Sequence, residues 1–177
     1  MRDPRIQTLA RNLVGYSIDC RPGDKVLVEM FGRERELVRA IVEEIQARDG
    51  LPYVNLIDHT VQRSLLKAAT EETVRFWADI DLYRMKRMDA YIGIRAGDNV
   101  NELSDVPDAN MRLYDKGYRH PVHSDQRVKH TKWVVLRYPN PSMAQLANTS
   151  TEAFEDFYFK VCNLDYARMS AAMDALV

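Results

Sequence analysis

Short apolar segments alternate with amphipathic segments along the whole chain. Four runs rich in Val, Ile, Leu, Tyr and Met have the length and composition of strands, and turn residues bound them. They lie at residues 25–30, 53–57, 89–94 and 131–137. Between them, apolar residues recur every three or four positions, which is typical of helices that cover a sheet. This alternation predicts an α/β fold, a Rossmann-like parallel sheet of about four strands with helices on both faces.

Capping residues help to place the predicted helices. Asp3 and Pro4 are typical of an N-cap followed by the first helical position, and Thr70 can cap a later helix. That later helix carries Val74, Trp77, Ile80 and Met88. Further helices are expected at about 33–48 and 61–69, and another follows Pro107. Because proline lacks a backbone N–H donor, we expect this last helix to bend or restart at Pro121.

Two helices are predicted after the fourth strand. The first has an apolar stripe at i, i+3, i+4 and i+7, formed by Phe154, Phe157, Tyr158 and Val161. The second can be capped by Asp165 and has an apolar face, expected to be buried, formed by Tyr166, Met169, Met173 and Leu176. No Gly, Asn or basic last turn ends this second helix before Val177. We therefore expect residues 1–177 to form a single α/β domain, the N-terminal part of a longer protein whose C-terminal domain is absent.

Composition excludes several classes of protein. The chain has 177 residues, of which 46% are hydrophobic and 29% are charged, and such a composition favours a folded domain over a disordered segment. A net charge of −1 argues against a general polyanion-binding protein. No apolar run approaches the ~18 residues that a membrane helix needs. The two cysteines, Cys20 and Cys162, are too few for a disulfide scaffold and fit a reducing compartment. These features predict a cytoplasmic protein with no membrane partner.

One basic stretch lies at residues 112–137. It combines Arg and Lys residues with Tyr114, Tyr118 and Trp133, a mixture found in single-stranded nucleic-acid sites. The two tyrosines are four residues apart on a predicted helix, however, and Trp133 opens a predicted strand, so packing explains all three aromatic residues equally well. A solvated or intramolecular surface is the simpler interpretation, and no nucleic-acid partner is predicted.

Candidate functional residues follow the predicted strands. Because the carboxyl ends of parallel strands meet at one edge of a sheet, the loops after them are the first place to look for a ligand site. These loops contain Asp58, His59, Arg95, Asp98, Arg137 and Asn140. We expect this polar edge to pack against, or form a cleft with, the remainder of a longer protein; a self-contained active site is the alternative. The loop after the first strand has one glycine where a dinucleotide fingerprint has three, which argues against a nucleotide site.

No catalytic residue and no metal ligand is predicted in the chain. His120 and His123 have a spacing that could bind zinc from a helix, but Pro121 disturbs that geometry and no Cys or Glu completes a pattern with His130. Solvated histidines are the simpler interpretation. Neither cysteine has a neighbouring histidine, and no serine lies in a Gly-x-Ser-x-Gly motif.

Several stretches carry a resemblance to a known family. They are Asp3-Pro4-Arg5-Ile6 and the segments 21–28, 101–107, 139–147, 154–158 and 162–166. Together they resemble the N-terminal domain of the thermophilic metallo-aminopeptidases of the aminopeptidase T type. The resemblance implies a cytoplasmic, usually homodimeric exopeptidase that removes N-terminal residues from peptides and uses two divalent metal ions, zinc, cobalt or similar. The ligands of these ions lie in the C-terminal half of such enzymes, so none is assigned to a residue of this chain.

Two hypotheses of different classes therefore remain. In the first, the chain is the N-terminal scaffold and cleft-wall domain of a metal-dependent aminopeptidase and is inactive alone. In the second, it is a free-standing binding or assembly module with the same fold and no catalysis.

Overall fold

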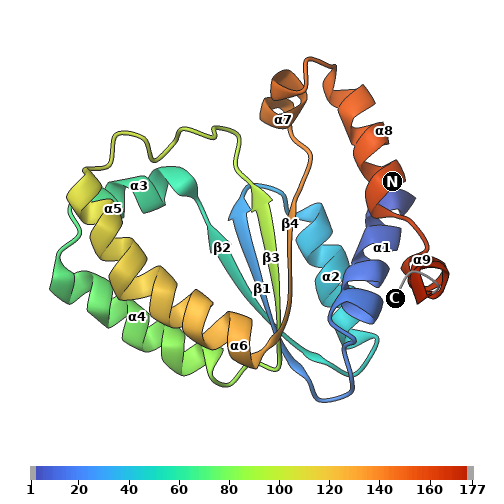
Figure 1. Cartoon of the computed structure of the whole chain (residues 1–177), viewed down its shortest axis with the longest axis horizontal. Helices are drawn as coiled ribbons and strands as arrows, with labels where there is room; N and C mark the ends of the chain where they lie inside the picture. The colour runs from blue at the N-terminus through green and yellow to red at the C-terminus, as the bar shows by residue number, and fades with distance from the viewer. Residues whose placement is uncertain (1–2, 175–177) are drawn as a thin grey trace.

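A computed structural model describes residues 3–174 of the chain. Its centre is a parallel sheet of four strands in the order β2-β1-β3-β4 (Figure 1). The strands are β1 (Lys25–Gly32), β2 (Leu51–Ile57), β3 (Ala90–Ala96) and β4 (Lys132–Arg137). Helices cover both faces, which confirms the predicted α/β fold.

Strand β2 begins two residues before its predicted start and includes Pro52. The backbone N–H of Leu51 donates to the carbonyl of Asp24 at 2.8 Å. The backbone N–H of Leu51 therefore points toward β1, and the backbone nitrogen of Pro52 points away from it. Since β2 is an edge strand, the missing N–H of Pro52 leaves no ladder bond unmade.

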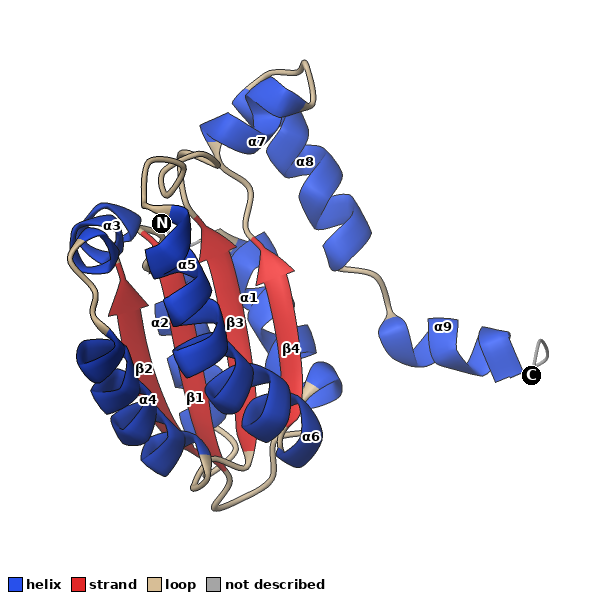
Figure 2. Ribbon diagram, turned by 60° about the vertical axis from the view of Figure 1, so that its left-hand side comes forward, coloured by secondary structure: helices blue, strands red, loops and turns tan. Residues whose placement is uncertain are grey.

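The helices divide between the two faces of the sheet (Figure 2). On one face lie α1 (Pro4–Arg11), the wide-turned π-helical segment η1 (Asn12–Ser17) and α2 (Glu36–Gln46). On the other lie α3 (His59–Lys67), α4 (Glu71–Met85), α5 (Asp108–Tyr114), the π-helical segment η2 (Asp115–Arg127) and α6 (Val128–His130). We call these the α2 face and the α4 face.

The larger part of the core lies on the α2 face. Val28 of β1 and Ile92 of β3 are fully buried there against aliphatic residues of α1 and α2 such as Leu9 and Ile41. The core on the α4 face is smaller and includes Leu27, Val74 and Tyr118. Alternate residues of β1 thus enter two separate cores, as the pleat of a strand requires.

Several predicted caps are confirmed, whereas the helix does not restart at Pro121. Asp3, Thr70 and Asp165 cap α1, α4 and α9 (Tyr166–Met173). The chain stays helical from α5 through η2 to α6. Pro121 lies inside η2, where the wider turn accommodates a residue without an N–H donor.

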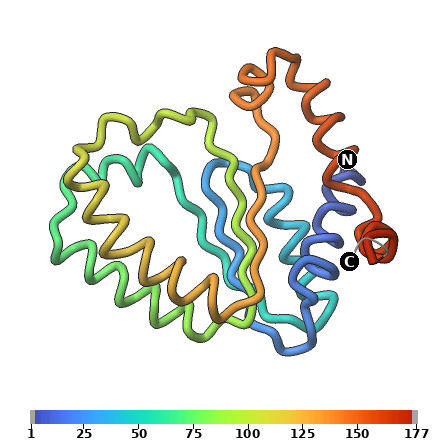
Figure 3. The backbone as a smooth tube through the Cα atoms, in the orientation of Figure 1, coloured from blue at the N-terminus to red at the C-terminus, as the bar shows by residue number. Residues whose placement is uncertain are grey.

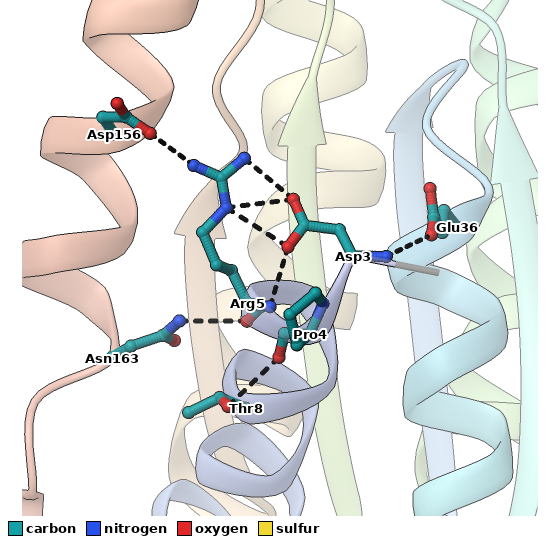
Figure 4. A network of polar contacts seen from close by, with 7 residues as sticks. All are labelled: Asp3, Pro4, Arg5, Thr8, Glu36, Asp156 and Asn163. Atoms are coloured by element: carbon teal, nitrogen blue, oxygen red, sulfur yellow. Dashed lines mark hydrogen bonds and ion pairs between the residues drawn. The ribbon is translucent and has the colours of Figure 1, made fainter. Parts of the chain in front are cut away.

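After β4 the chain forms α7 (Pro141–Leu146), α8 (Thr151–Cys162) and α9, which run back along the α1 side of the molecule (Figure 3). Arg5 of α1 holds α8 in place (Figure 4). Its guanidinium donates to the carboxylates of Asp3 and Asp156 and lies 4.7 Å from the ring centre of Phe159, and its carbonyl accepts from Asn163 at 2.9 Å.

The expected apolar faces of α8 and α9 require correction. Tyr158 and Phe159 are buried against Tyr138, but Phe157 and Val161 are 62% and 47% exposed. The face of α8 that packs is therefore set by Tyr138 and Arg5 rather than by the apolar stripe. In α9, Tyr166 stacks on Tyr16 at 5.6 Å, whereas Met169 and Met173 are exposed. Leu176 lies outside the described residues.

Candidate functional site

The sheet has a crevice where its strand order reverses. From β1 the chain moves to β2 on one side and then returns to β3 on the other, so the carboxyl ends of β1 and β3 flank the point at which parallel sheets commonly bind ligands. Gly32 ends β1 there with φ of +125°, and a Cβ atom on it would lie 2.3 Å from the carbonyl oxygen of Ala96. Only glycine permits this close approach of the two strands.

A buried polar network lies beneath the crevice, on the α4 face. Glu29 of β1 is almost fully buried and accepts hydrogen bonds from the Tyr91 hydroxyl at 2.7 Å and the Asn55 amide at 3.0 Å. Burial, and then the carboxylate of Glu29, raise the pKa of Tyr91. Gly93 makes this possible, because a Cβ there would lie 2.8 Å from the Tyr91 ring. Three adjacent strands thus hold one carboxylate with two donors.

Above this network is a cavity of about 510 Å³, which we call the crevice cavity. Three arginines line it, from β3 and η2, together with a single carboxylate, that of Asp115. Its histidines come from α3 and η2, and apolar and aromatic side chains form much of the remaining wall. These groups are Arg95, Arg119 and Arg127; His59, His120 and His123; and Phe31, Leu103, Met111 and Tyr114.

Two of the arginines are held by aromatic rings rather than by carboxylates. The guanidinium carbon of Arg95 lies 3.7 Å from the ring centre of Phe31. That of Arg127 lies 4.9 Å from the ring centre of Tyr91 and 4.7 Å from that of Trp133. Within residues 3–174, neither guanidinium forms an ion pair with a carboxylate. Arg119, by contrast, pairs with Asp115 at 2.7 Å.

Two histidines of the crevice cavity have lowered pKa values. The pKa of His123 is lowered to about 4, mainly by burial and then by the neighbouring Arg127, Arg95 and Arg119. Burial, and then Arg95, also lower the pKa of His59. His123 Nδ1 accepts a hydrogen bond from Arg127 Nε at 3.3 Å, which places the ring proton of neutral His123 on Nε2. Both histidines are therefore neutral near pH 7.

Five of the six residues predicted to share the polar edge line three different hollows, and Arg137 lines none of these three. His59 and Arg95 line the crevice cavity. Asp58, His59 and Asp98 line a second hollow of about 160 Å³. Asp98 and Asn140 line a third, of about 420 Å³, beside α8. Arg137 is exposed on edge strand β4, next to Arg95 in the sheet register.

Two of these six residues have clear local structural roles. Asp58 caps α3 by accepting from the backbone N–H groups of Thr60 and Val61, and the hydrogen bonds from Thr60 lower its pKa. Asn140 caps α7 by accepting from Met143 N–H at 2.9 Å and donates to the carbonyl of Gly97 at 2.8 Å. Asn140 thereby ties the loop after β4 to the loop after β3.

The sequence prediction missed Glu29, His123 and Arg127 as parts of one site. The last two belong to η2, a crossover segment, and reach the crevice through long-range packing. One signal was present: Glu29 is the only charged residue in the apolar run 26–30, and a charge inside a buried strand requires a partner.

The described residues do not fit a metal centre. In residues 3–174 no three His, Cys, Asp or Glu side chains converge in a way that could hold an ion. His120 pairs with Asp125 at 2.9 Å, while His123 packs against Tyr91 and Tyr118. Burial raises the pKa of Cys20 and Cys162, so neither thiol is activated. No helix in this part of the chain is long and apolar enough to cross a bilayer.

Comparisons with known proteins identify a family and solved structures with a similar fold. A family model described as thermophilic metalloprotease (M29) matches residues 2–174. The structure of wild-type AmpT from Thermus thermophilus aligns with a TM-score of 0.73 at 15% identity, and this likeness shows a common fold. The alignment covers 97% of this chain and 46% of that one, so the chain spans about half the length of this relative. No curated protein sequence is significantly similar to the chain.

Proposed function

From the premise that this chain belongs to the thermophilic metalloprotease family M29, we propose that it is the N-terminal scaffold and cleft-wall domain of a metal-dependent aminopeptidase. The observation that carries the proposal is the family match over residues 2–174. The whole enzyme removes N-terminal residues from peptides in the cytoplasm, works as a homodimer and uses two divalent metal ions, zinc, cobalt or similar. These ions are held by a C-terminal catalytic domain outside this chain.

In this proposal the carboxyl-end edge of the sheet is the functional surface. Asp58, His59, Arg95, Asp98, Arg137 and Asn140 form the wall of the substrate cleft or the contact with the catalytic domain. Two features support this role: the edge carries several polar hollows, and the crevice is the usual ligand side of a parallel sheet. The chain contributes shape and charge to the cleft, and no catalytic step is assigned to its residues.

The direct test is an aminopeptidase assay of the 177-residue chain on an aminoacyl anilide. With zinc, cobalt or manganese added, we expect no turnover above that of the metal alone, because the described residues supply no metal centre. A circular dichroism spectrum of the same sample is the control that tests whether the chain is folded. Robust turnover that a chelator abolishes would contradict the proposed inactivity.

The alternative, a free-standing binding or assembly module, is favoured by one observation: the crevice cavity is formed by this chain alone. The coding sequence after Val177 separates the two functions. A continued open frame with Glu, His and Asp ligands supports the aminopeptidase domain, whereas an immediate stop codon supports the module.

A further inference from the structure

We propose that the crevice cavity binds an oxyanion, the carboxylate of a short peptide or a phosphate group, through Arg95 and Arg127. The site is a binding site and not a catalytic one. Its existence stands on the geometry of this chain, whereas the peptide as the source of the carboxylate rests on the proposed function.

Arg127 is the first arginine of the proposed site. Its Nη1 atom is shielded from solvent and has no hydrogen-bond partner among residues 3–174. Leaving a charged donor buried and unpaired costs more than leaving a neutral one. The guanidinium carbon lies 4.9 Å and 4.7 Å from the ring centres of Tyr91 and Trp133, and contact with these two rings restricts its position.

Arg95 is the second arginine of the proposed site. It lies on the ring of Phe31, at the carboxyl end of β3, and forms no ion pair in the part of the chain that the structure describes. Guanidinium groups stacked on aromatic rings keep their N–H donors available at the edge, and these donors match the two oxygens of a carboxylate or phosphate. Two such arginines line the same cavity, and Arg95 adds to burial in lowering the pKa of Arg127.

The field inside the cavity also favours an anion. The crevice cavity is lined by three arginines and one carboxylate. Burial is the main cause of the lowered pKa values of His59 and His123, and the arginines lower them in addition. Glu29, below the cavity, is already engaged by Tyr91 and Asn55. An anion would relieve the repulsion between the arginines, and the neutral His123 could donate from Nε2.

The rest of the wall distinguishes between a free ion and an organic acid. Leu103 and Met111 form an apolar part of the wall, beside the ring of Phe31. A carboxylate that carries small apolar side chains would bury them there, while inorganic phosphate would not. A short peptide with a free carboxyl end therefore fits the cavity better than phosphate does.

The test measures binding to the 177-residue chain by calorimetry at neutral pH and constant ionic strength. The probes are dialanine, dialanine amide and inorganic phosphate. We expect dialanine to bind at least about tenfold more tightly than its amide, because hydrogen bonds between charged groups are the stronger class. Arg95→Gln should weaken dialanine binding about tenfold, whereas Arg11→Gln, at an exposed arginine of α1 on the opposite face of the sheet, should leave binding unchanged.

Histidine titration by NMR gives a second readout in the unmodified chain. A bound anion should raise the pKa of His123, because it offsets the arginines that lower it. Phosphate that binds while dialanine does not would keep the oxyanion site and identify phosphate as its source, without bearing on the aminopeptidase assay. Equal binding of dialanine and its amide with no phosphate binding, or binding insensitive to Arg95→Gln in a folded variant, would overturn the proposal.

Discussion

The two faces of the sheet differ in what they bury. The α2 face buries mostly aliphatic side chains, such as Val28, Ile41 and Ile92. The α4 face buries Glu29 and places Tyr91 and the half-buried Arg127 beside it. Because burial of charge and polar groups offsets much of what their contacts gain, the second face is expected to contribute less net stability per residue. One face thus holds the fold together, and the other gives up stability to shape a charged cavity.

The largest effect should come from the α2 face. Ile41 is 0% exposed, and Ile41→Ala should lower the free energy of unfolding by ~2–5 kcal/mol through lost burial and an unfilled cavity. Its matched control is Ile80→Ala on α4, since Ile80 is 52% exposed and should cost less than ~0.5 kcal/mol. Urea denaturation measures both. Equal losses in the two variants would show that burial of Ile41 on the α2 face does not contribute the expected stability.

The stability of the protein should depend on pH through His123 on the α4 face. The folded-state pKa of His123 is lowered to about 4 from an ordinary 6.5, so the unfolded chain binds a proton more readily than the folded chain. Stability is therefore full above pH ~6.5 and falls by ~3 kcal/mol as pH drops to ~4. Burial is the main cause of this shift, Arg127, Arg95 and Arg119 add to it, and Asp81 opposes it.

Variants separate this histidine from the carboxylates that titrate nearby. His123→Gln keeps an acceptor for Arg127 and removes the titration, so the stability difference between it and the unmodified chain should change with pH between ~4 and ~6.5 and be constant above that range. The exposed His130→Gln is the control. A constant difference across the whole range would contradict a buried, neutral His123.

The contrast between the two faces also explains what the sequence could predict. The α/β fold could be predicted because β1 and β3 are mostly apolar runs. The helix starts could be predicted because Asp3, Thr70 and Asp165 are N-caps, which bind backbone groups only a few residues away. Buried aliphatic surfaces and caps depend little on distant parts of the chain.

The rest depended on long-range packing. The apolar spacing of α8 did not reveal that Arg5 and Tyr138 select the face of Tyr158 and Phe159. Similarly, the loops after the strands suggested a polar edge, but Arg127 reaches the crevice from a helical crossover that wraps across β3 and β4. Half of the predicted edge residues cap helices or are exposed to solvent. Sequence alone does not separate them from binding residues, because caps and loops use the same polar side chains as binding sites.

The smallest effect should come from a single hydrogen bond of the polar network. Tyr91→Phe removes the donor to Glu29 and leaves the carboxylate with the Asn55 amide, which should cost ~1–3 kcal/mol because a buried acceptor is left unsatisfied. Tyr83→Phe, an exposed tyrosine on α4, controls for the loss of a hydroxyl. In the double variant Tyr91→Phe with Glu29→Gln, the loss should be smaller than the sum of the single losses, since the two residues share one interaction. Strictly additive losses in urea denaturation would mean that Glu29 and Tyr91 are not coupled, and the α4 face would then differ from the α2 face in composition only.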